Sequence, residues 1–336
     1  MASTDVAHRT SRLPGSGWLE TLLVSLGIRG RALVIAIPFV WLFLFFFVPF
    51  LIVLWVSTSF VVIAQPPYTH ITPEGTFALN IGESYKRLFV DALYFKSYLN
   101  SLLVAAVSTI LCLVIAYPMA YGMARCSHST RNILLMLVIL PFWTSFLIRV
   151  YAWIGLLKNN GLINNGLIGL RDHVSYYLTY CFGDGAGDWV SSIALPINMM
   201  NTNFAVYLGI VYSYLPFMIL PLYATLEKMD LSLIEAATDL GCKPLKAFFV
   251  ITVPLSFPGI VAGSMLVFIP AVGEYVIPEL LGGPSSLMIG RVLYNEFFSN
   301  RDWPTASALA IAVLIALVGP LMIYQKYQDK ELEKES

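Results

Sequence analysis

Residues 227–257 read EKMDLSLIEAATDLGCKPLKAFFVITVPLSF and lie between two long apolar runs. Ser232 and Glu235 have the spacing of a capping box, in which each side chain satisfies a backbone N–H at the start of a helix. Apolar residues then recur at helical spacing. These residues are Leu233, Ile234, Ala237 and Leu240. The stretch therefore predicts a short helix that begins at Ser232.

The same stretch predicts where that helix ends and a second one begins. Gly241 follows the last apolar residue of the pattern, where a helix commonly ends in the left-handed conformation. Pro244 suits the first turn of a second helix, and Pro254 is predicted to end it. We therefore expect two short helices joined by a tight turn, lying outside the membrane.

The composition indicates that the rest of the chain lies in lipid. Hydrophobic residues make up 58% of the 336 residues, charged residues make up 12%, and the mean hydropathy is +0.75. Soluble domains carry about 25% charged residues, so this chain cannot hide its apolar side chains in one soluble core. The formal net charge is zero, which gives no basic footprint for a nucleic acid.

Six segments are long and apolar enough to cross a bilayer as helices, for which about 20 residues are needed. They are Leu33–Val56, Leu99–Ala124, Ile133–Trp153, Phe204–Leu226, Pro258–Leu281 and Ala306–Tyr324. Several contain proline, which neighbouring helices make tolerable in lipid. The predicted fold class is an all-α integral membrane protein with six transmembrane helices.

Lysine and arginine near the ends of these segments predict the orientation. They are denser and closer to the spans in one set of segments than in the other. The first set has Arg29, Arg31, Arg125, Arg131, Lys228, Lys243, Lys246, Lys326, Lys330 and Lys334, and the second, in much longer loops, has Lys86, Arg87, Lys96, Lys158, Arg171, Arg291 and Arg301. Both termini, as the segment 1–32 and the tail 326–336, are therefore expected in the cytoplasm.

Outer loops at 57–98, 154–203 and 282–305 are rich in Asn, Gly, Pro and aromatic residues, and residues 183–187 are expected to form a turn or loop. This topology places Cys126 and Cys242 inside and Cys181 outside, so no disulfide is expected.

The loop 227–257 resembles the EAA loop of ABC importer permeases. Glu235-Ala236-Ala237, Gly241 six residues after the glutamate, and Ile251-Thr252-Val253-Pro254 match that motif, with Val253 where the family has leucine. Four further stretches are similar to the permeases of putrescine and spermidine importers. They are residues 132–135, 141–153, 263–274 and 278–284, and the likeness covers nearly all of the chain after about Arg31.

This resemblance implies a type I importer permease fold in the inner membrane of a bacterium. Residues 33–56 would form a first helix, and residues 99–325 a five-helix core. The implied partners are a second, similar permease, two copies of an ATPase subunit that hold ATP and Mg, and a periplasmic substrate-binding protein. No cofactor is implied for this chain. Glu235, Ala236, Ala237 and Gly241 would couple it to the ATPase, although on propensity alone Glu235 is only a capping residue.

Other classes of protein fit the residues less well. The sequence contains no Gly-Lys pair, so it lacks the phosphate-binding loop of an ATPase. Its four histidines are scattered without metal-ligand spacing. A secondary transporter usually shows an internal repeat, which we do not find. A secondary transporter and an ABC permease for another small solute are the alternatives to a polyamine permease.

The predicted substrate path centres on Glu274, because acids inside a membrane usually face a cavity or a partner. Glu279 ranks below it, since it lies five positions further on. Aromatic side chains on other spans would complete a cation-binding cage. The candidates are Trp143, Tyr151, Tyr212 and Tyr214. The alternatives are an ion pair between Glu274 and Arg149, and aromatic residues that anchor the membrane interface. Which polyamine is preferred stays open.

Overall fold

A computed structural model describes residues 30–335 except 73, 183 and 196. Its apolar runs form helices, which satisfy their own backbone hydrogen bonds as lipid requires. The elements in chain order are α2 (Gly30–Leu42), the π-helix η1 (Phe43–Phe47), α3 (Val48–Ser57), β1 (Phe60–Val61), β2 (Tyr68–Thr69), α4 (Ile81–Val90), α5 (Ala92–Arg125), α6 (His128–Ile139), η2 (Leu140–Trp143), α7 (Phe146–Leu157), α8 (Leu162–Phe182), α9 (Asp184–Ser191), α10 (Asn203–Glu227), α11 (Ser232–Asp239), α12 (Pro244–Ala247), the π-helix η3 (Phe248–Thr252), α13 (Val253–Leu255), α14 (Phe257–Val272), α15 (Val276–Leu280), η4 (Pro284–Ser286), α16 (Ile289–Tyr294), the π-helix η5 (Asn295–Ser299) and α17 (Trp303–Glu335).

Helices form most of each of the six predicted spans. Within the described residues, three helices are long and apolar enough to cross a membrane alone: Ile35–Ser57, Ala92–Arg125 and Asn203–Glu227. Two bent pairs, 128–182 and 244–272, bring the number to five if each pair is one span. The apolar part of α17, Trp303–Gly319, is shorter, and the helix continues beyond it to Glu335. The chain is thus a multi-pass helical membrane protein.

Two of the predicted spans are broken helices. The third span was predicted as one helix, but η2 ends at Trp143 and α7 begins at Phe146. The helical segments 128–143 and 146–182 are bent by 91° relative to each other. Pro141 lies at the start of η2, where its ring prevents a regular helix from continuing. The carbonyl of Pro141 instead accepts hydrogen bonds from the N–H and hydroxyl of Thr144. The fifth predicted span ends early, at Val272, and resumes at Val276 as the short helix α15.

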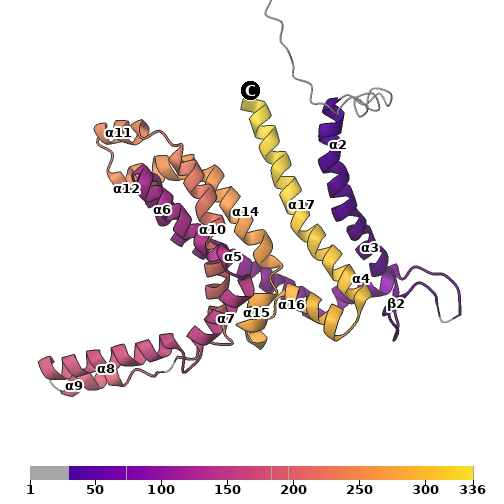
Figure 1. Cartoon of the computed structure of the whole chain (residues 1–336), viewed down its shortest axis with the longest axis horizontal. Helices are drawn as coiled ribbons and strands as arrows, with labels where there is room; N and C mark the ends of the chain where they lie inside the picture. The colour runs from indigo at the N-terminus through magenta and orange to yellow at the C-terminus, as the bar shows by residue number, and fades with distance from the viewer. Residues whose placement is uncertain (1–29, 73, 183, 196, 336) are drawn as a thin grey trace, which may run out of the picture.

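Helix α10 lies at the centre of the core, between α5 and α14 (Figure 1). Its side chains Ile210, Met218, Ile219 and Leu222 are fully buried. On α14, Gly259 and Gly263 form a small-xxx-small pair that lets the two backbones approach closely. A Cβ built on Gly259 would lie 2.6 Å from Thr225 Oγ1 and 2.9 Å from the Pro221 carbonyl oxygen.

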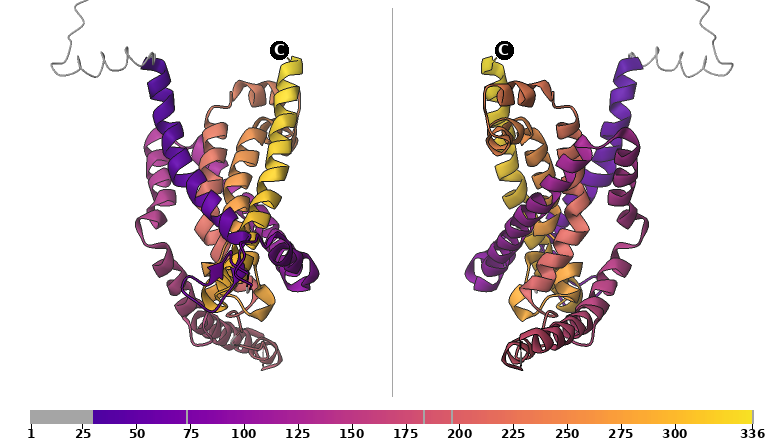
Figure 2. Two further views of the ribbon diagram at one scale, coloured as in Figure 1. Left: turned by 90° about the vertical axis from the view of Figure 1, so that its right-hand side faces the viewer. Right: turned by 90° about the vertical axis from the view of Figure 1, so that its left-hand side faces the viewer.

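The elements divide between two opposite ends of the molecule. Helices α11 and α12 lie at the same end as the start of α2 and the C-terminal end of α17 (Figure 1). Helices α7, α8, α9 and α15 lie at the other end in both further views (Figure 2). Helices α3 and α17 pack against each other beside the core.

The segments predicted as outer loops contain regular structure. Residues 57–98 hold the antiparallel pair β1–β2, the helix α4 and the start of α5. Residues 154–203 hold all of α8 and α9. The prediction of a turn was wrong at residues 184–187, because Asp184–Ser191 is helical and packs along α8; residue 183 lies outside the described residues. That packing outweighs the low helix propensity of Gly185 and Gly187.

The close approach of α10 and α14 can be tested at Gly259. We expect Gly259→Ala to lower the stability of the detergent-solubilised protein by about 1–3 kcal/mol, because the new methyl group must push the helices apart. Thermal unfolding is measured as the loss of monodisperse protein on heating. Gly122→Ala on α5 is the control, since a Cβ there meets nothing within 4 Å. Equal stability of the two variants would contradict the packing described above.

Candidate functional site

The first candidate site is the pair of short helices outside the spans. Helix α11 begins at Ser232 as predicted, but the capping box is wrong: Leu231 is the N-cap and makes no side-chain capping bond. Asp230 Oδ1 instead accepts the Ser232 N–H at 3.0 Å. The backbone and side-chain hydrogen bonds from Ser232 hold the pKa of Asp230 below its usual range. Asp230 therefore accepts the N–H that the capping box assigned to Glu235, and the Glu235 side chain is exposed.

Gly241 ends α11 in the left-handed conformation, as predicted, with φ at +79°. The N–H of Cys242 bonds to the Ala237 carbonyl at 3.0 Å, and the N–H of Gly241 bonds to the Thr238 carbonyl at 2.9 Å. These two bonds make a Schellman motif, which satisfies the last carbonyl groups of a helix. The corner between α11 and α12 is therefore set by hydrogen bonds and by the conformation of one glycine.

The two helices present an apolar tip. Ile234 and Ala237 are half-buried, while Leu233, Leu240 and Leu245 are exposed. Leu240 is 89% exposed, which is unusual for a leucine unless another surface covers it. Glu235 and Ala236 are exposed on the same short helix.

The second helix of this site differs slightly from its prediction. Pro244 lies in its first turn, as predicted. The helix continues through η3 and ends at Leu255, one residue beyond Pro254. The wider π-helical turn accommodates Pro254, whose ring would clash with the Val250 carbonyl in a regular α-helix. A bend of 65° then leads into α14.

The second candidate site is the break between α14 and α15, where Glu274 lies. Tyr214 on α10 donates its hydroxyl hydrogen to Glu274 Oε2 at 2.5 Å. Glu274 Oε1 accepts the N–H groups of Val276 at 3.0 Å and Ile277 at 3.4 Å. The Glu274 side chain is buried, and it satisfies donors that the broken helix leaves without a carbonyl partner.

Arg149 does not pair with Glu274, so the predicted alternative of an ion pair between them is wrong. The Arg149 guanidinium lies over the rings of Phe142 and Phe146, at 5.5 and 5.8 Å. Its Nε and Nη1 atoms are buried and have no hydrogen-bond partner in the described part of the chain. The prediction assumed one continuous helix over residues 133–153, and the break before α7 gives α7, which carries Arg149, a different direction.

The other predicted path residues are scattered. Glu279 forms an ion pair with Arg291 at 2.5 Å, a partner that the sequence analysis did not find. Trp143 and Tyr151 are exposed, and Tyr212 packs edge-on against Trp153 with ring centroids 5.3 Å apart. Of the six predicted path residues, the structure joins only Glu274 and Tyr214 directly.

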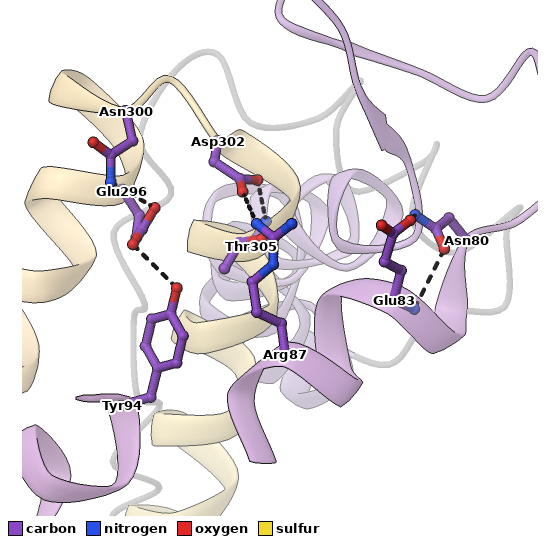
Figure 3. A network of polar contacts seen from close by, with 8 residues as sticks. All are labelled: Asn80, Glu83, Arg87, Tyr94, Glu296, Asn300, Asp302 and Thr305. Carbon is purple, nitrogen blue, oxygen red and sulfur yellow. Dashed lines mark hydrogen bonds and ion pairs between the residues drawn. The ribbon is translucent and has the colours of Figure 1, made fainter. Parts of the chain in front are cut away.

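A polar network holds η5 and the start of α17 against α4 and α5 (Figure 3). Arg87 pairs with Asp302 at 2.7 Å, and Asp302 Oδ1 accepts the Thr305 N–H at the start of α17. Glu296 accepts hydrogen bonds from Tyr94 at 3.1 Å and from Asn300 at 3.0 Å. These residues lie in segments predicted as loops or span ends. Arg87 lies 215 positions from Asp302, and Tyr94 lies 202 positions from Glu296, so no local pattern reveals these two pairs.

Comparisons with known proteins agree with this architecture. Residues 113–334 match the family described as binding-protein-dependent transport system inner membrane component. The chain is 38% identical over 298 residues to the spermidine/putrescine transport system permease protein PotB of Escherichia coli strain K12, covering 88% of this chain and 98% of that protein.

Solved structures show the same fold. The chain resembles a bacterial ABC transporter involved in the import of the acidic polysaccharide alginate, with a TM-score of 0.61 at 14% identity over 93% of this chain and 98% of the other. It also resembles a bacterial alginate ABC transporter in complex with an alginate pentasaccharide-bound periplasmic protein, with a TM-score of 0.60 at 14% identity over 90% and 94%. At this identity the likeness concerns the fold alone.

The corner at Gly241 yields a prediction about the α11–α12 segment. A non-glycine residue in the left-handed conformation costs roughly 1–2 kcal/mol, while asparagine tolerates it. Gly241→Val should therefore speed amide hydrogen exchange across residues 232–247 by a factor of about 5–30. Gly241→Asn, the matched control, should leave exchange close to that of the unaltered protein. Equal exchange in both variants would show that the conformation of this residue does not hold the corner.

Proposed function

The chain belongs to the binding-protein-dependent transport system inner membrane component family, and we propose that it forms the membrane path of a bacterial importer for polyamines of the putrescine and spermidine class. It is an ABC importer permease subunit and not an enzyme. The observation that carries the polyamine assignment is the 38% identity to PotB, which covers 98% of that protein.

Glu274 is the acid we assign to the path of a cationic substrate. Glu279 is already neutralised by Arg291, whereas among the described residues the Glu274 carboxylate is bound by a hydroxyl and two backbone N–H groups alone. A carboxylate has about four lone-pair sites, so these three bonds leave room for an ammonium group. Tyr214 orients the carboxylate. Trp143, Tyr151 and Tyr212 are secondary candidates, which would offer ring faces to the cation.

The α11–α12 segment is the element we assign to coupling with an ATPase partner. Leu233, Leu240 and Leu245 supply exposed apolar area, and the small side chains of Ala236 and Ala237 allow close approach. The exposed carboxylate of Glu235 is placed to meet a basic side chain of the partner. Gly241 sets the corner through which movement passes to α14.

The proposed assembly has this chain beside a second, similar permease, with two copies of an ATPase subunit that bind ATP and Mg in the cytoplasm. A periplasmic substrate-binding protein delivers the amine. Support for the last partner comes from the fold, which resembles a transporter described in complex with a periplasmic protein. We place α11, α12 and both termini in the cytoplasm. The start of α2 and the end of α17 lie at the same end as α11 and α12 (Figure 1).

The orientation is tested with Cys242, at the Gly241 corner. A membrane-impermeant thiol reagent applied to intact cells should leave Cys242 unlabelled, and it should label Cys242 in inverted membrane vesicles. Asn159→Cys is the reference for the outer side, because Asn159 lies exposed in the turn between α7 and α8. Labelling of Cys242 in intact cells would reverse the topology.

The function is tested by uptake into proteoliposomes that contain the complete importer. We expect ATP-dependent import of radiolabelled putrescine or spermidine, and no import of alginate oligosaccharide. Glu274→Gln keeps the shape of the side chain and removes its charge. It should raise the amine concentration for half-maximal uptake by about tenfold or more, because a hydrogen bond to a charged group contributes about 1.5–3 kcal/mol.

Two variants separate this role from a structural one. Glu83→Gln removes an exposed carboxylate on α4, far along the chain from the break, and should leave uptake unchanged. Tyr214→Phe keeps the charge of Glu274 but removes one of its hydrogen bonds, so it should have a smaller effect on amine affinity. Normal uptake by Glu274→Gln would remove Glu274 from the path. If the polyamine assignment itself is wrong, the unaltered importer will import no amine.

A further inference from the structure

Helices α8 and α9 form an arm that projects from the core, opposite α11 and α12 (Figures 1 and 2). The helical segments 128–143 and 146–182 meet at 91°. Figure 1 shows the arm running across the direction of the long helices. If the spans cross the bilayer, the arm runs along its surface.

The base of the arm is held by a buried asparagine. The Asn164 side chain is fully buried, and its Nδ2 donates to the carbonyls of Lys158 at 3.1 Å and Ile197 at 3.0 Å. Its Oδ1 accepts the Ile197 N–H at 2.9 Å. Arg171 donates to the Ile193 carbonyl further along the hairpin. These bonds fix the arm at both of its connections, which a simple linker between two spans would not require.

One face of α8 is exposed, apolar and aromatic. At 100° per residue, this face carries Leu162, Gly166, Leu170, His173, Tyr176, Tyr177, Tyr180 and Cys181. Tyr180 is 82% exposed, and the other two tyrosines and both leucines are also largely exposed. The charged residues of α8, Arg171 and Asp172, lie off this face and pair with each other at 2.8 Å.

We propose that this face of α8 lies in the lipid interface of the outer leaflet, so that the arm is an in-plane membrane anchor. Tyrosine and tryptophan favour the level of the lipid headgroups, and an exposed apolar strip of this length is unstable in water. The arm begins where α7 ends, and α7 itself exposes Leu147, Ile148 and Tyr151. Apolar side chains are thus exposed on both sides of the turn between α7 and α8.

The same face argues against an electrostatic partner. It carries no Lys, Arg, Asp or Glu, so it would bind lipid by burying apolar area and not by attraction to anionic headgroups. The arm has a mechanical consequence, because α7 packs against α15. An anchored arm holds α7, and through it the break at Glu274, at a constant depth in the bilayer.

Cys181 provides the probe, because it is a free, exposed cysteine on the proposed lipid face. In a protein with Cys112→Ala, Cys126→Ser and Cys242→Ser, a nitroxide label is attached at Cys181. The complete importer is then reconstituted in phosphatidylethanolamine and phosphatidylglycerol vesicles. Power saturation should show access to oxygen above access to a water-soluble nickel chelate, at a depth of about 5–10 Å in the interface.

Asp172→Cys in the same background is the matched control, because it lies nine residues away and half a turn round the helix. A label there should favour the nickel chelate. Tyr177→Asp with Tyr180→Asp should move the label at Cys181 towards the chelate as well. The proposal is overturned if Cys181 is open to the chelate in the unaltered arm. It is also overturned if Cys181 is closed to both reagents, or becomes closed when the binding protein is added, since a protein would then cover this face.

Discussion

A backbone N–H or C=O inside a membrane has no water to bond, and the structure of this chain follows from that constraint. Most of the chain meets it with long helices. Where helices break, side chains and turns provide the missing partners. The Glu274 carboxylate accepts two N–H groups at the start of α15, and the Thr144 hydroxyl bonds the Pro141 carbonyl before α7. The breaks are therefore stabilised by specific hydrogen bonds, and they place polar groups at positions where an unbroken helix would have none.

Helix α14 joins the two candidate sites. Its first end follows the bend after Leu255, where Tyr117 on α5 bonds the Ser256 hydroxyl at 2.8 Å. Its other end leads into the break at Glu274. The 16 residues between these points form one helix of about 24 Å, clamped to α10 through Gly259 and Gly263. A rigid helix of this kind gives the proposed coupling a direct route from α11–α12 to the acid in the path.

The sequence predicted the two helices and the corner of the segment 227–257 well because their signals are local. Gly241 needs only its own backbone conformation, and Pro244 needs only the first turn of a helix. The capping box failed because Asp230 competes for the same N–H two residues away, and spacing alone does not decide between two acceptors. The arm was missed because Gly185 and Gly187 indicate a turn when α8, against which this segment packs, is not considered.

What the sequence determined by itself was the membrane environment, the approximate spans and the two-helix form of the segment 227–257, since hydropathy, length and short motifs are properties of neighbouring residues. What the tertiary structure decided was which distant groups meet. Glu274 bonds Tyr214 and not Arg149, and Arg87 pairs with Asp302 across 215 positions. Those pairings depend on the angles at which helices break and cross. Such angles are set by packing between helices, which no single segment of the sequence contains.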